Sequence, residues 1–316
     1  MAKFNWDENL PPAKWEKKED PDYWERRRQQ ARFSSSSGIL IGKDLSTGLP
    51  FHISPSQLST HMHVLGASGV GKSFFLEGIL KLLILQGQGV CLIDPHGDLY
   101  HRLLEFCTWL HFHHPEKGIA QRLIPFDIAE RQHIFGFNPV ARNARVMTYQ
   151  VVALIEAIRK VWGQESFDST PRLARWLFNT AYAIIERELT LLQAKHLIDP
   201  KPNEQREAIA GRIQNPDIRA EWDYISALRE KERNEFMESS FNRLRPFVMN
   251  EVISLIVGRK ERVIDFPLLL NDRKILLVNL ARQNTIADDY QQMLGTMLVN
   301  EILTAAFARP RGQRAP

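Results

Sequence analysis

The chain has 316 residues and a formal net charge of +4 at pH 7; 44% of its residues are hydrophobic and 25% are charged. This composition is typical of a soluble globular protein of one large or two modest domains, which excludes wholesale disorder, and the charge permits a polyanionic partner. No apolar run approaches the ~18 residues that cross a membrane, no signal peptide opens the chain, and two cysteines make no disulfide framework, so we expect a cytoplasmic protein.

Residues 1–37 differ in composition from the rest of the chain. Trp6, Trp15 and Trp24 are spaced nine apart among charges of both signs, and four serines end the segment. The pattern predicts an N-terminal arm with a flexible joint. The arm either packs its tryptophans on the body of the protein or docks to a neighbouring subunit or partner, and the sequence leaves both alternatives open.

The next predicted elements form a strand–loop–helix–strand unit. Between Gly38 and Ser54 the pattern favours a β-hairpin. His61–Leu65 reads as a strand that enters a glycine-rich loop, Phe74–Leu85 as a helix that is apolar nearly all round, and Val90–Ile93 as the following strand. A helix this apolar belongs inside a protein, and the order of elements predicts a parallel α/β sheet.

The glycine-rich loop, GASGVGKS, fits the pattern G-x-x-x-x-G-K-[ST] at every required position. Its glycines allow successive backbone N–H groups to point at phosphate oxygens, and the following helix adds the positive end of its dipole. We expect Lys72 to reach the β- and γ-phosphates of ATP as a catalytic charge, and the Ser73 hydroxyl to bind Mg²⁺. The candidate nucleotide-binding residues are Gly66, Ala67, Ser68, Gly69, Val70, Gly71, Lys72, Ser73 and Phe74.

A second candidate is Asp94, which ends the strand after the loop and begins the sequence DPHGD. Ligands of doubly wound sheets bind at the carboxyl ends of the strands, so we predict a catalytic and magnesium-side role for Asp94. The alternative is a tight turn in which Asp98 caps the helix Leu99–Leu110. Nearby, His111, His113 and His114 lack a carboxylate or cysteine partner in sequence, which disfavours a metal cluster.

Beyond Asn143 the pattern becomes helical for about a hundred residues before a strand at Lys274–Leu280 and a helix at Asp288–Phe307. The helical block therefore interrupts an α/β domain. The predicted helices are Val151–Trp162, Leu173–Leu192, Glu204–Ile213, Ala220–Phe236 and Ser239–Val257. The predicted domains are the arm at 1–37, the first part of the α/β domain at 38–143, the all-α insertion at 144–262, and the continued α/β domain at 263–316.

Three stretches together resemble the HerA/FtsK superfamily, especially its conjugative coupling proteins (TraG/TraD-like) and HerA-like DNA translocases. They are His61–Ser73, Cys91–Leu99 and Phe135–Pro139, supported by KILLVNLARQ at 274–283. The resemblance implies a P-loop NTPase with a RecA-like (ASCE) parallel sheet, an inserted all-α domain and an extended N-terminal arm. It also implies hexameric rings that hydrolyse ATP with Mg²⁺ and move along double-stranded DNA, with a nuclease, a relaxase or a secretion component as further partners.

One expected feature of this family is missing from the sequence. It is an apolar strand that ends in Asp-Glu, in which the Asp holds Mg²⁺ through water and the Glu activates the attacking water. We therefore keep two alternatives to a complete motor: the front part of a longer or split protein, and a short form that binds nucleotide as a scaffold for partner proteins. A small-molecule phosphotransferase is a third hypothesis, without a marked acceptor pocket. DNA contacts would come from the clusters of basic residues at 26–28, 243–245, 259–262 and 309–314.

Overall fold

The computed structural model describes residues 38–43, 48–58, 60–130, 136, 138–142, 146–162, 171–199, 201, 204–249, 251–258, 264–281 and 288–309. The predicted arm and its tryptophans lie outside these ranges. The chain divides into two compact units, the first ending at Leu83 and the second beginning at Ile84. The predicted domain boundaries at 143/144 and 262/263 remain predictions.

The first unit opens with the predicted hairpin. β1 (Ile39–Lys43) pairs antiparallel with β2 (Pro50–Ile53), with a register shift between Leu40 and Gly42, and a single turn, α3 (Pro55–Leu58), follows. α4 (Lys72–Leu85) begins directly after the glycine-rich loop. The predicted strand at His61–Leu65 is wrong, because these residues pair with no strand that the structure describes and Leu65 is 78% exposed. A strand requires a neighbour that completes its hydrogen-bond ladder.

The second unit contains a three-stranded parallel sheet, as predicted. β3 (Val90–Asp94) and β4 (Leu123–Asp127) both pair with β5 (Ile275–Asn279), so the strand order is β3-β5-β4. The register places the last residues of the three strands in one row, Asp94 beside Asn279 and Asn279 beside Asp127. The carboxyl edge of the sheet therefore begins with three polar side chains.

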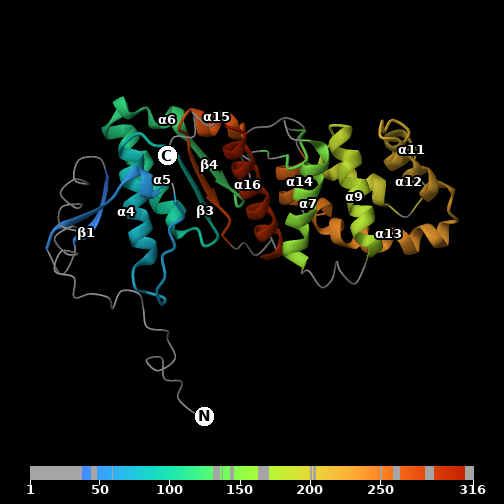
Figure 1. The fold of residues 1–316 in the computed structure, drawn as a ribbon, viewed down its shortest axis with the longest axis horizontal. Helices are drawn as coiled ribbons and strands as arrows, with labels where there is room; N and C mark the ends of the chain where they lie inside the picture. The colour runs from blue at the N-terminus through green and yellow to red at the C-terminus, as the bar shows by residue number, and fades with distance from the viewer. Residues whose placement is uncertain are drawn as a thin grey trace, which may run out of the picture. The chain divides into compact units, whose positions relative to one another are not determined.

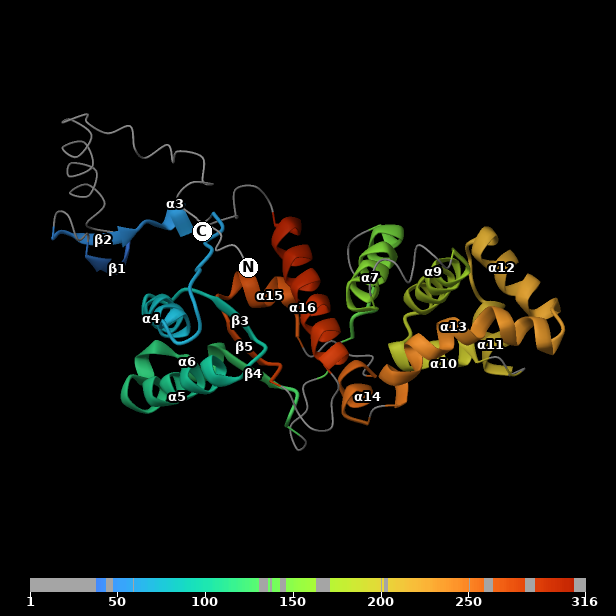
Figure 2. The same cartoon turned by 90° about the horizontal axis from the view of Figure 1, so that it is seen from below.

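All five residues of β5 are buried, which fits a central strand with both faces covered. Leu276 and Val278 join the large hydrophobic cluster that includes α16 (Asp288–Ala308), whereas Ile275 and Leu277 lie outside that cluster. This alternation follows from the two-residue period of a strand. Figure 2 shows α5 and α16 on opposite sides of the sheet.

α5 (Asp98–His113) forms because its buried residues recur at helical spacing: Leu99, Leu103, Cys107 and Leu110. After α5 come a short 3-10 turn, η2 (Pro115–Lys117), and α6 (Ile119–Arg122), which lead into β4. α15 (Phe266–Asn271) precedes β5, and the Asp265 carboxylate caps it by accepting the Leu268 N–H at 2.9 Å.

The helical block is inserted between β4 and α15, in agreement with the predicted fold class (Figure 1). Its helices form a continuous core around Trp176 and Trp222, whose rings meet edge to face with centroids 5.5 Å apart. The block consists of α7 (Met147–Trp162), α9 (Pro171–Glu186), η3 (Leu191–Gln193), α10 (Ala194–Ile198), α11 (Glu204–Ala210), α12 (Pro216–Ala227), α13 (Glu230–Met249) and α14 (Glu251–Val257).

Several predicted helices in the block are wrong in extent, including Ser239–Val257, which begins inside α13. The predicted helix Leu173–Leu192 ends at Glu186, because Glu188 takes a left-handed conformation (φ 50°) and Thr190 starts a new turn through a capping box with Gln193. The predicted helix Ala220–Phe236 is interrupted after Ala227, and α13 then continues to Met249 without the predicted break near residue 238. At these points, residues that favour turns end a helix even though the helical spacing of apolar residues continues.

Arg206 is a buried cation in the helical block, with only 2% of its surface exposed. Its guanidinium donates to the carbonyl oxygens of Asp199 at 2.9 Å and Lys201 at 3.0 Å, and contacts Met237 Sδ at 3.4 Å. Burial lowers the pKa of Arg206, and the nearby Arg233 lowers it further. The guanidinium thereby ties the segment between α10 and α11 to α13.

Candidate nucleotide-binding site

The loop Gly66–Ser73 curls back on itself ahead of α4. Gly69 and Gly71 have φ values of +82° and +90°, which side-chain-bearing residues rarely adopt. The ammonium group of Lys72 donates to the carbonyl oxygens of Gly66 at 2.8 Å and Ala67 at 2.6 Å. The first helical residue is thus folded back over the start of its own loop.

The loop is tightly folded at Gly66 but exposed to solvent along most of its length. A Cβ atom at Gly66 would lie 2.7 Å from Val70 Cγ2, so a larger residue would crowd the loop. Ser68, Ser73 and Phe74 are exposed, and Phe74 is 77% exposed. Of the nine predicted residues, the first six form the loop 66–71, and the last three are the first residues of α4.

This geometry fits a triphosphate with Mg²⁺. The N-terminal end of α4 carries unpaired backbone N–H groups and a partial positive charge, both of which favour phosphate oxygens. The Ser73 hydroxyl is an exposed hard oxygen donor of the type that Mg²⁺ prefers. Lys72 supplies a compact positive charge beside these groups.

Asp94 lies at the carboxyl end of β3, as predicted, and only 7% of its surface is exposed. Its Oδ2 accepts the backbone N–H groups of Leu99 at 2.9 Å and Tyr100 at 3.0 Å, and its Oδ1 accepts that of His96 at 2.9 Å. Asp94, which lies outside α5, therefore accepts hydrogen bonds from backbone N–H groups of the first turn of that helix. The predicted capping role of Asp98 is wrong, because the N-cap position is Gly97 (φ 87°) and the N–H donors point to Asp94.

Sequence reasoning missed two residues at the same edge, Asn279 and Asp127. Asn279 is 2% exposed; its Nδ2 donates to Asp127 Oδ2 at 2.9 Å, and its Oδ1 accepts the Ala281 N–H at 2.9 Å. The second carboxylate oxygen of Asp127 accepts the Ala129 N–H at 2.7 Å. The signal that could have found them is that each is the polar residue at the end of an otherwise apolar strand.

The carboxylates at this edge act on Tyr100. Burial, together with the negative charges of Asp127 and Glu130, raises the pKa of Tyr100 to about 12. The phenol therefore stays protonated throughout the physiological range. Asp127 thus belongs to a negatively charged region around the start of α5.

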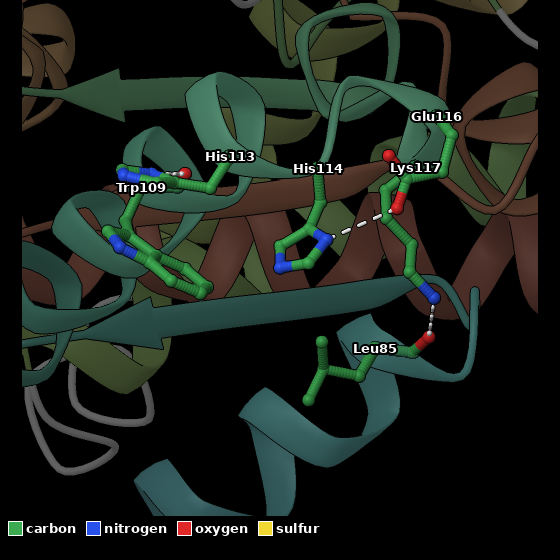
Figure 3. A network of polar contacts seen from close by, with 6 residues as sticks. All are labelled: Leu85, Trp109, His113, His114, Glu116 and Lys117. Atoms are coloured by element: carbon green, nitrogen blue, oxygen red, sulfur yellow. Dashed lines mark hydrogen bonds and ion pairs between the residues drawn. The ribbon is translucent and has the colours of Figure 1, made fainter.

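The three histidines at the end of α5 and just after it each have a different neighbour, and Figure 3 shows those of His113 and His114. The His113 ring stacks on Trp109 with centroids 4.8 Å apart, and its Nδ1 lies 2.9 Å from the Trp109 carbonyl oxygen. His114 Nδ1 lies 3.2 Å from Glu116 Oε1, and the His111 ring lies against Phe112. Across the part of the chain that the structure describes, no three His, Cys, Asp or Glu side chains form a group able to hold a metal ion.

Of the basic clusters predicted from sequence, Arg309 is the one residue whose side-chain contacts are described. It donates to Asn271 Oδ1 at 3.1 Å and to the Leu270 carbonyl at 2.9 Å, so it joins the end of α16 to α15. The predicted contacts of the other clusters with DNA fall on residues or side chains outside the description. No helix within the described ranges has the length and apolar character of a membrane span.

A parallel α/β sheet, an inserted helical block and a glycine-rich loop that opens a helix define a P-loop NTPase fold. The sequence matches the family described as "Helicase HerA, central domain" over residues 39–283. This match covers more than half of the chain, and the chain belongs to that family.

Solved structures of coupling proteins share the fold. TrwBdeltaN70, a bacterial conjugative coupling protein in an unbound monoclinic form, superposes with a TM-score of 0.56 at 13% identity, over 90% of this chain and 59% of that chain. The plasmid coupling protein TrwB in complex with the non-hydrolysable GTP analogue GDPNP gives 0.54 at 14% identity, and its complex with ADP and Mg²⁺ gives 0.50 at 14%. Both of these matches cover 90% of this chain and 60% of TrwB, so the chain spans about three fifths of these structures. No curated protein matches the sequence.

Proposed function

We propose that the chain binds ATP with Mg²⁺ through the loop Gly66–Ser73 and acts as a cytoplasmic motor subunit that moves or processes double-stranded DNA. The observation that carries the proposal is the loop itself, with Gly69 and Gly71 at positive φ and Lys72 folded over the start of the turn. The family's description as a helicase domain supports the DNA part. The nucleotide complexes of TrwB support the choice of ligand.

Each residue has a role that follows from its donors and acceptors. An ammonium group has three N–H donors, and Lys72 uses two on the loop carbonyls, which leaves one for a phosphate oxygen. Ser73 would bind Mg²⁺, whose charge neutralises the phosphates during transfer. Asp94 Oδ1 accepts one N–H and keeps a second acceptor position, with which it would orient a magnesium-bound water.

A second candidate function is a nucleotide-binding scaffold with little turnover. The observation that favours it is that none of the three parallel strands is followed by glutamate: Asp94 precedes Pro95, Asp127 precedes Ile128, and Asn279 precedes Leu280. Among the described parallel strands, none therefore ends in the Asp-Glu pair that would activate the attacking water. The two functions share nucleotide binding and differ in hydrolysis.

Turnover of ATP by the purified chain, with and without duplex DNA, tests the proposal. We expect DNA-stimulated hydrolysis that is abolished by Lys72→Ala and preserved by Lys195→Ala, an exposed lysine of α10. Tight ATP binding without hydrolysis would select the scaffold. Absence of ATP binding by the unaltered protein would reject both functions.

The proposed assembly is a homo-oligomeric, hexameric ring, with a nuclease, relaxase or secretion component as further partners. The resemblance to HerA/FtsK-type translocases, which form hexameric rings, supports this assembly. Mass photometry with and without Mg²⁺ and a non-hydrolysable ATP analogue measures the assembly. Six-subunit particles that depend on nucleotide are expected, and a monomer under all conditions would contradict the ring.

A further inference from the structure

The amino edge of the sheet, formed by residues 85–89, 115–122 and 271–274 that lead into its three strands, carries positive side chains. Arg122 and Lys274 directly precede β4 and β5, and Arg273 precedes Lys274. The register places the first residues of the three strands in one row. Because parallel strands begin at the same edge, Arg122 and Arg273 meet there although 151 positions separate them in the sequence.

Two lysines at the amino edge are held by backbone carbonyl groups. Lys117 Nζ donates to the Leu85 carbonyl at 3.1 Å (Figure 3). Lys274 Nζ donates to the Gln121 carbonyl at 2.9 Å and lies 3.7 Å from Asp272 Oδ2. A neutral carbonyl fixes the position of an ammonium group without cancelling its charge, and an ammonium group has three N–H donors. Both lysines therefore keep donors for a further partner.

Arg122 and Arg273 are neighbouring cations at the same edge. Arg122 Nε donates to the Arg273 carbonyl at 3.1 Å, and its Nη2 donates to the Gln88 carbonyl at 2.5 Å. Burial lowers the pKa of Arg122, and the positive charge of Arg273 acts in the same direction. Within the described residues, neither guanidinium group forms an ion pair. Two like charges that repel each other favour a bound anion, because the anion offsets the repulsion.

The backbone of Arg273 has a conformation that is costly for an arginine. Its φ of 51° lies in the left-handed region, which Gly or Asn adopts more readily. A Cβ atom at Gly89 would lie 3.0 Å from Arg273 Cα, so the glycine permits the close approach of this turn. The Arg273 side chain is exposed and forms no hydrogen bond within the described chain. The fold therefore gains little from an arginine at this position, which points to a ligand outside the fold.

A structural role accounts for only part of this arrangement. Lys117 and Arg122 join neighbouring segments through carbonyl groups and so help to close the edge of the sheet. This role does not explain the exposed charge of Arg273. Across residues 85–89, 115–122 and 271–274, four Lys and Arg side chains face two carboxylates. The carboxylates are Asp272 and Glu116, whose Oε1 lies 3.2 Å from His114 Nδ1. The amino edge therefore keeps an excess of positive charge.

We propose that four cations of the amino edge form a surface that binds the phosphate backbone of duplex DNA: Lys117, Arg122, Arg273 and Lys274. The proposal rests on the proposed action on DNA and adds to it a contact surface that includes none of the basic clusters predicted from sequence. A guanidinium group presents paired N–H donors that match phosphate oxygens. The four cations come from two separate segments, so successive phosphates of one backbone can contact several of them at once.

The test measures binding of fluorescently labelled duplex DNA by anisotropy, without nucleotide, between about 50 and 200 mM salt. The double variant Lys117→Gln with Arg273→Asn removes two charges, and asparagine tolerates the left-handed backbone. We expect affinity to fall ~5-fold or more at low salt, and the dependence of log K on log salt to become less steep by ~2. The matched control is Lys195→Gln with Arg219→Gln, which removes two exposed charges from α10 and α12 and should change affinity less than ~2-fold.

Two further variants separate charge from folding. Lys117→Arg with Arg273→Lys preserves both charges and is expected to bind DNA like the unaltered protein. Arg273→Asn alone removes a side chain without contacts in the described chain, so its melting temperature should be unchanged while the salt dependence becomes less steep by ~1. This single variant keeps the test decisive if the neutral double variant is unstable.

Three results would overturn the inference: equal affinities of the neutral double variant and the control, an equal loss of affinity in both, or weak binding by the charge-preserving variant. A competition with inorganic phosphate at constant ionic strength distinguishes the source of the phosphate group. Displacement of the duplex by millimolar phosphate would indicate a site for free phosphate and would also overturn it. Absence of DNA binding by the unaltered protein at low salt would instead reject the DNA part of the proposed function.

Discussion

The Asp94 carboxylate accepts the backbone N–H of Leu99 at 2.9 Å, so the last residue of β3 holds the first turn of α5. We expect Asp94→Ala to lower the free energy of unfolding by about 2–4 kcal/mol, because three N–H groups lose a charged acceptor in a buried setting. Asp94→Asn should cost less, because one oxygen remains. Chemical denaturation measures both values.

The matched control is Asp98→Asn, four residues further along the same turn. The Asp98 side chain is exposed and does not cap α5, so its replacement is expected to change stability by less than about 0.5 kcal/mol. If Asp98→Asn were as destabilising as Asp94→Ala, the assignment of the cap to Asp94 would be wrong.

Gly71→Ala should weaken binding of ATP strongly while leaving the protein folded. The methyl group forces a left-handed residue at φ +90°, which costs about 1–2 kcal/mol locally and turns an N–H group away from the phosphates. Isothermal titration with Mg²⁺ and ATP measures the affinity. Gly78→Ala is the control on the same helix: a Cβ atom there meets open space, and we expect about 0.5–1 kcal/mol of added stability with unchanged affinity.

Comparison of Gly97→Ala with Gly118→Ala separates the effect of backbone strain from the effect of a steric clash. Both glycines have positive φ, at 87° and 59°, and both substitutions pay for the left-handed backbone. A Cβ atom at Gly97 also meets Asn279 and Ala281 below 3.0 Å, whereas at Gly118 its nearest neighbour is Gln121 Oε1 at 3.5 Å. We expect Gly97→Ala to lower the melting temperature clearly more than Gly118→Ala. Equal shifts in melting temperature would show that Asn279 and Ala281 move aside without a measurable loss of stability.

The two thiols should be unreactive in the folded protein. Burial raises the pKa of both Cys91 and Cys107 to about 11 from an ordinary value of 9.0, so the folded chain keeps its thiol protons where an unfolded chain releases them. Stability is therefore expected to fall as pH rises from about 9 towards 11. Labelling by a disulfide reagent at pH 8 should be slow until denaturant is added, and immediate labelling of both thiols would contradict their burial.

The sequence was sufficient for the fold class and for the position and backbone shape of the glycine-rich loop, because both depend on local pattern. The structure of β3, of β5 and of the loop Gly66–Ser73 is determined by residues within each segment: apolar runs in the strands, and the spacing of glycines in the loop. Sequence reasoning failed where the role of a residue depends on a partner that is distant in the sequence. Nothing near Asn279 in the sequence indicates Asp127, which lies 152 positions earlier and meets it through the sheet register.

The strand order has a consequence for the way the chain folds. β5 is the last strand of the sheet in sequence, yet it lies between β3 and β4, which have no direct pairing in the described sheet. On the ribosome, about 180 residues follow β3 and about 150 follow β4 before their common neighbour emerges. The intervening helices have mainly local contacts and can form first. Closure of the sheet is then a late, slow step, during which two unpaired strand edges are exposed to chaperones or to other chains.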